Sequence, residues 1–67
     1  MNDEYISAKI KEFREAHQVS EMDMATAIGT PFTFYRVFEE TPSKFDPSML
    51  EKAAARLGVS VSELTGE

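Results

Sequence analysis

The chain of 67 residues has no cysteine, no tryptophan and a single histidine, His17. Without cysteine there is no disulfide framework and no thiolate metal site, and one histidine does not complete a metal site by itself. No serine or threonine stands in a nucleophile elbow, and no glycine-rich phosphate loop occurs. We therefore predict no catalytic residues, no metal and no cofactor, and expect that the protein is not an enzyme.

Long hydrophobic runs and an excess of positive charge are also missing. No apolar run approaches the roughly 20 residues that span a bilayer, and the start, Met1-Asn2-Asp3-Glu4, is acidic where a signal peptide is basic. We expect a cytoplasmic protein without a membrane segment. Seven lysines and arginines stand against twelve acidic residues, which gives a formal net charge of −5. That balance is unusual for a nucleic-acid binder, since most carry a basic face.

What the sequence does contain is a regular set of helix signals. Five positions carry residue types that cap helix N-termini: Asp3, Ser20, Thr30, Asp46 and Ser60. Thr30 and Asp46 are each followed by a proline, which suits the first helical position. Ser20 and Ser60 each have an acidic capping-box partner three residues later. Helix ends are expected near His17-Gln18, at Gly29 and at Gly58.

Apolar residues between these signals recur at helical spacing and form the expected core. They are Ile6, Ile10, Phe13, Met24, Ala25, Ile28, Tyr35, Phe38, Leu50, Ala53, Ala54, Leu57, Val61 and Leu64. No segment alternates with period two over a useful length, so strands are not expected. The sequence predicts one all-α domain, residues 1–67, of five short helices.

The segment from Ser20 to Glu40 has the pattern of a helix-turn-helix. Two expected helices are joined by a tight turn at Gly29, and the small Ala25 stands where they would cross. Any corner between two helices could use the same residues for packing alone. The pattern therefore favours, without requiring, a DNA-binding motif.

Several runs extend this pattern to most of the chain: Ile10–Glu15, Val19–Ser20, Met24–Ala25, Ile28–Gly29, Phe38–Glu39 and Leu57–Leu64. Together they resemble the lambda-repressor/Cro-like helix-turn-helix family, also called the xenobiotic-response-element type, from about Ile6 to Leu64. The resemblance implies a five-helix lambda-repressor-like DNA-binding domain that usually reads a palindromic operator as a dimer. It also implies an ion pair between Arg14 and Glu39.

By the register of that family, the third helix enters the major groove with Phe32, Thr33, Arg36 and Val37 outward, and Phe34 partly so. Arg36 could bind guanine in bidentate fashion and Thr33 offers a hydroxyl, while Phe32 and Val37 could contact a thymine methyl group. The family usually has hydrogen-bonding residues at these positions. This helix is therefore more apolar than the family pattern.

Phosphate contacts are expected from Lys44, in the loop before the fourth helix, and from Lys11, the cation of the first helix that we expect to be free. The glutamine with which the family usually begins its second helix is replaced by Glu21, which would repel phosphate. Residues Ser20 to Thr41 carry four acidic side chains and one basic side chain. Few phosphate contacts predict weak and salt-sensitive binding.

Two functions follow. The first is a sequence-specific DNA-binding transcriptional regulator that binds double-stranded operator DNA as a dimer. The alternative is a protein-interaction module, in which Phe32, Phe34, Arg36 and Val37 form an apolar patch ringed by acidic residues. Hydrogen-bonding side chains on the third helix would favour the first, and apolar and acidic ones the second. The 67 residues could also be the N-terminal domain of a longer protein.

Overall fold

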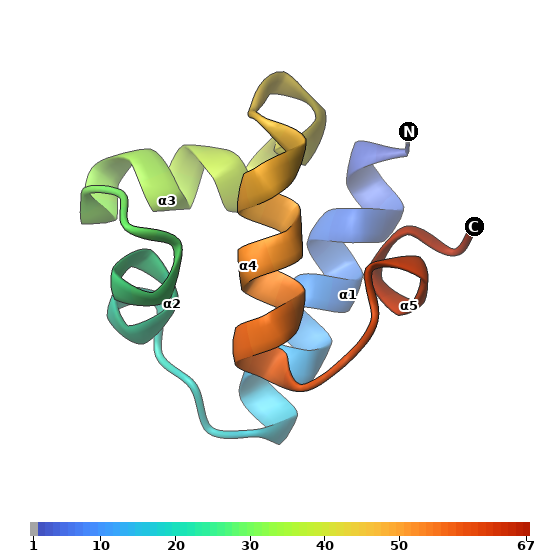
Figure 1. Cartoon of the computed structure of the whole chain (residues 1–67), viewed down its shortest axis with the longest axis horizontal. Coiled ribbons are helices and arrows are strands. Elements are labelled where there is room, and N and C mark those ends of the chain that lie inside the picture. Colours follow the sequence, from blue (N-terminus) through green and yellow to red (C-terminus); the bar gives the residue numbers. More distant parts are fainter. Residues whose placement is uncertain (1) are drawn as a thin grey trace.

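A computed structural model describes residues 2–67, and within them the chain forms α-helices and one 3₁₀ turn, with no strand. The elements are α1 (Asp3–Ala16), α2 (Glu21–Ile28), α3 (Phe32–Glu40), the 3₁₀ turn η1 (Pro42–Lys44), α4 (Pro47–Leu57) and α5 (Val61–Thr65). Figure 1 shows α4 in the middle of the molecule, with α2 and α3 to one side and α1 and α5 to the other. The predicted all-α class with five helices is confirmed.

The core lies where the inner faces of these helices meet. Its buried hydrophobic residues are Ile6, Ile10, Val19, Met24, Ala25, Ile28, Tyr35, Phe38, Leu50, Ala53, Ala54, Leu57 and Leu64. Two predicted core residues differ. Phe13 is only partly buried against the core, and Val61, the first residue of α5, is exposed whereas Leu64 is fully buried.

Most predicted helix ends are confirmed. Ser20 and Asp23 form the reciprocal capping box of α2, and Asp46 caps α4 by accepting a hydrogen bond from the Ser48 N–H at 2.9 Å. The Ser60 hydroxyl accepts from the Glu63 N–H and caps α5. Gly29 and Gly58 end α2 and α4 in the left-handed region, with φ of 81° and 71°, which glycine adopts without a Cβ penalty.

Two predicted caps are wrong. Asn2, not Asp3, caps α1 by accepting a hydrogen bond from the Tyr5 N–H at 3.1 Å. Thr30 does not cap α3, because the helix begins one residue later than predicted; its N–H donates to Ala25 O at the end of α2. The extended Pro31 takes the N-cap position without a side-chain hydrogen bond, and α3 begins at Phe32.

Asp3 instead joins α1 to the connection between α3 and α4. Its two carboxylate oxygens accept hydrogen bonds from the Ser43 N–H and the Ser43 hydroxyl, each at 2.8 Å. Beside this contact, the Phe45 ring packs edge-on against the buried Phe38, with centroids 5.8 Å apart. The connection that carries Lys44 is therefore held to the body of the molecule. Across residues 2–67, none of the helices is both long and apolar enough to cross a membrane.

Candidate nucleic-acid interface

The outer face of α3 contains the residues predicted to read DNA. Tyr35 and Phe38 are fully buried and fix the helix to the core, so the opposite side of the helix faces solvent. Phe32, Phe34 and Val37 are 38%, 58% and 51% exposed, and Thr33 and Arg36 are exposed with them. The structure therefore places Phe32, Thr33, Arg36 and Val37 on one exposed helix.

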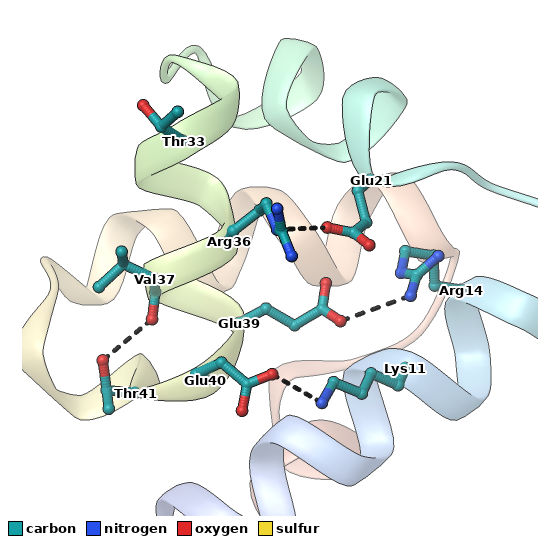
Figure 2. Close-up of a pocket in the computed structure, with 9 residues that line it drawn as sticks. All are labelled: Lys11, Arg14, Glu21, Thr33, Arg36, Val37, Glu39, Glu40 and Thr41. Carbon is teal, nitrogen blue, oxygen red and sulfur yellow. Dashed lines mark hydrogen bonds and ion pairs between the residues drawn. The ribbon is translucent and has the colours of Figure 1, made fainter.

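A shallow groove of about 550 Å³ opens beside this face, between α3, the start of α2 and α1. Its lining residues are Lys11, Arg14, Glu21, Thr33, Arg36, Val37, Glu39, Glu40 and Thr41. In Figure 2, Arg36, Glu39 and Glu40 reach from α3 toward α2 and α1, whereas Thr33 and Val37 point away from them. The predicted readout residues thus form two groups on either side of the exposed face.

Each cation in the groove has a carboxylate partner. Lys11 Nζ lies 2.8 Å from Glu40 Oε1, Arg14 Nη2 lies 3.4 Å from Glu39 Oε1, and Arg36 Nε lies 3.6 Å from Glu21 Oε2. Three positive and three negative side chains therefore line the groove, and its formal charge is zero. A phosphate placed here would meet a carboxylate beside each of these cations.

Lys11 does not have the predicted free ammonium group. It donates a hydrogen bond to Glu40, and that bond raises the pKa of Lys11 above its usual value of 10.5. The sequence offered no local signal for this pair, because its members are 29 residues apart on different helices. The prediction that Lys11 is the free cation of the first helix is wrong.

The Arg14–Glu39 pair implied by the family resemblance is present and lies inside the molecule. Only 16% of the Arg14 side chain and 4% of the Glu39 side chain are exposed. Arg14 also donates from Nη1 to the Val19 carbonyl at 3.3 Å, so it joins α1 to the start of α2 as well as to α3. Because a buried charge without a partner is costly, this pair is a fixed part of the scaffold under α3.

Three buried polar atoms next to this pair have no partner with ordinary hydrogen-bond geometry: Arg14 Nε, Glu39 Oε2 and the Tyr35 hydroxyl. Burial raises the pKa of the Tyr35 hydroxyl far above its usual value of 10.0, and the neighbouring Glu39 carboxylate raises it further. The hydroxyl therefore stays protonated beside the Glu39 carboxylate. All three of these unpaired atoms are buried, so none of them lies on the exposed face of α3.

Lys44 lies at the end of η1, exposed, and forms no ion pair within the described part of the chain. Phe32, at the other end of the face, is the first residue of α3. A nine-residue helix spans roughly 13 Å, and this length of α3 separates Phe32 from the connection that carries Lys44. Of the two lysines predicted to bind phosphate, Lys44 alone is presented in this way.

The described residues contain no cluster of histidine, aspartate or glutamate side chains suited to a metal ion. Comparison of the chain with protein-family models, with curated proteins and with solved structures finds no match.

Proposed function

We propose that the chain is a sequence-specific DNA-binding transcriptional regulator of the lambda-repressor/Cro-like type, in which α2 and α3 form the helix-turn-helix. The observation that carries this proposal is the placement of α3. One side of the helix is fixed to the core by Tyr35 and Phe38, and the other side projects side chains into solvent. A rigid helix at the edge of a small domain fits the major groove of B-form DNA.

The side chains of this face suggest a division of roles. Arg36 offers a bidentate contact to guanine, and the Thr33 hydroxyl offers a single hydrogen bond to a base edge. Phe32 and Val37 would contact thymine methyl groups. Lys44 would hold a phosphate, while Lys11 would do so only after it leaves Glu40. We further propose that two copies bind the two half-sites of a palindromic operator.

Binding through this face gains little from electrostatics. The groove beside α3 has no net charge, and the chain as a whole carries −5. Because phosphate contacts supply most non-specific affinity, specific recognition would rest mainly on base contacts. We therefore expect weak binding to scrambled DNA. Because the salt slope scales with the number of phosphates neutralised, we also expect a shallow dependence of affinity on salt, in place of the salt-sensitive binding expected from the sequence.

The proposal is tested by fluorescence anisotropy on the purified chain, with duplexes from its own upstream promoter and with scrambled duplexes, across a salt series. Replacing Arg36 by alanine should weaken promoter binding by roughly tenfold, the value of one good bidentate base contact. The matched control is Lys52→Ala, which removes the same charge from the exposed side of α4, outside the groove. Equal affinities for the Arg36 variant and the unaltered chain would contradict the proposal.

The apolar character of α3 favours a second candidate function, a protein-interaction module. Phe32, Phe34 and Val37 are large, exposed and on the same helix, and acidic side chains outnumber basic ones around them. Phe34 separates the two functions because it has no assigned base contact. If promoter and scrambled duplexes both bind negligibly at low salt while the chain is folded, a protein ligand that is lost with Phe34→Ser becomes the better explanation.

A further inference from the structure

Arg36 is held from two sides on the face of α3. Its Nε atom lies 3.6 Å from Glu21 Oε2, at the first turn of α2. Its guanidinium carbon lies 5.9 Å from the centre of the Phe32 ring, one helical turn earlier on α3. A cation over an aromatic face is attracted to it, and a carboxylate beside the guanidinium fixes its direction.

The contact with Glu21 leaves the outer end of the guanidinium group available. The contact with Glu21 is made at Nε, and the Arg36 side chain donates no hydrogen bond within residues 2–67. The Arg36 side chain remains 67% exposed. Two parallel N–H donors from its terminal nitrogens Nη1 and Nη2 match the O6 and N7 acceptors of guanine in the major groove.

Positioning of this kind matters because arginine is long and flexible. An exposed arginine loses much of its rotamer freedom when it binds, and that loss weakens binding. A side chain already held over Phe32 and against Glu21 has less freedom to lose. At the same time the Glu21 carboxylate repels nearby phosphates, which lowers affinity for DNA of any sequence.

We infer that Glu21 and Phe32 position Arg36 to read a guanine in each half-site, so that Glu21 sets sequence specificity at the cost of overall affinity. This inference rests on the proposed DNA-binding function. From the sequence, Glu21 at the start of α2 was expected only to repel phosphate. In this inference it also orients Arg36. Phe32 becomes a platform for Arg36 in addition to its own base contact.

The test compares Glu21→Gln with Glu40→Gln, which makes the same change of charge at the Lys11 pair. Selection from a random duplex library with the unaltered chain gives the preferred sequence, and duplexes with adenine in place of each guanine then measure preference. The unaltered chain should prefer guanine at one position by roughly tenfold. Glu21→Gln should lower that preference by about threefold or more and bind scrambled DNA at least as tightly. Glu40→Gln should bind the preferred and the scrambled duplexes more tightly and should keep the preference for guanine.

An unchanged guanine preference in Glu21→Gln would overturn the inference while leaving DNA binding in place. If the unaltered chain enriches no sequence, the proposed function fails. The positioning of Arg36 is then tested by NMR on the free protein. The Nε–H signal of Arg36 in NMR spectra should be sharp in the unaltered chain and in Glu40→Gln. In Glu21→Gln it should broaden, because the released N–H exchanges with water. Equal signals in all three would overturn the positioning. Thermal unfolding of each variant checks that the fold is kept.

Discussion

Tyr35 is fully buried on α3, and its hydroxyl lies next to the Glu39 carboxylate that also binds Arg14. Its ring packs against Phe38, with centroids 5.9 Å apart. A buried hydroxyl without a well-formed hydrogen bond contributes little, since it lost its water partners on folding. We expect the ring, and not the hydroxyl, to supply the stability that this residue gives.

Replacing Tyr35 by phenylalanine should therefore change the free energy of unfolding by less than about 1 kcal/mol. Phe38→Ala, which empties a fully buried site beside it, should cost about 3–5 kcal/mol. Urea unfolding followed by circular dichroism measures both. A loss of stability in Tyr35→Phe as large as that in Phe38→Ala would mean that the hydroxyl bridges Glu39 to another buried group.

At the scale of a single element, α4 shows how an N-cap depends on charge. The Asp46 carboxylate accepts a hydrogen bond from the Ser48 N–H, and this bond lowers the pKa of Asp46 below its usual value of 3.8. A lowered pKa in the folded state means that the carboxylate form is stabilised by folding. That contribution is present above pH 3.8 and is lost as the pH falls through the lower pKa of the folded chain.

Asp46→Ala should accordingly lower the melting temperature at about pH 7, and should have a smaller effect at the lowest pH at which the chain stays folded, because protonation of Asp46 weakens the cap. Ser60→Ala removes a cap that does not titrate, at the start of α5. Its effect on the melting temperature should therefore be similar at both pH values. Parallel changes of the two variants with pH would show that the charge of Asp46 has no part in capping α4.

Elements were also the scale at which the sequence was most informative. The capping box at Ser20, the Asp46-Pro47 start and the glycines that end α2 and α4 are local features, and local features need no knowledge of the tertiary fold. Thr30 was predicted wrongly because α3 begins at Phe32 and not at Pro31, which leaves Pro31 at the N-cap position.

At the scale of the whole molecule, the sequence could predict which face of α3 is exposed. It could not predict which carboxylates pair with the cations beside that face. The pairs Lys11–Glu40 and Arg36–Glu21 each join two helices. Neither has a spacing that a helical pattern would reveal, because each forms only when α1 and α2 pack beside α3. The one interhelical pair expected from sequence, Arg14–Glu39, came from the family resemblance and not from periodicity.

The Lys11–Glu40 pair allows the effect of the net charge of the molecule on DNA binding to be separated from the effect of one carboxylate beside Lys11. Glu40→Gln should free Lys11 for a phosphate and steepen the slope of log affinity against log salt by about 0.9. Lys11→Met should weaken binding only slightly in the unaltered chain, and clearly in the Glu40→Gln background. These changes are measured by anisotropy across a salt series.

The control for this prediction is Glu51→Gln, which makes the same change in net charge on the exposed side of α4. It should raise affinity by less and leave the salt slope unchanged, because no cation is released near the interface. If Glu40→Gln and Glu51→Gln behave alike, then the overall charge of the molecule governs binding and the local pair does not.

The contact of Asp3 with Ser43 also has a consequence for the order of folding. It joins positions 40 residues apart, and closing so long a loop costs more entropy than forming the short turn between α2 and α3. Contacts of high sequence separation slow folding, so we expect this one to form after α2 and α3 have docked. When the first turn of α1 frays, the connection that carries Lys44 loses its two hydrogen bonds at the same moment. The order of the connection that carries Lys44 is thus coupled to the N-terminal turn of α1.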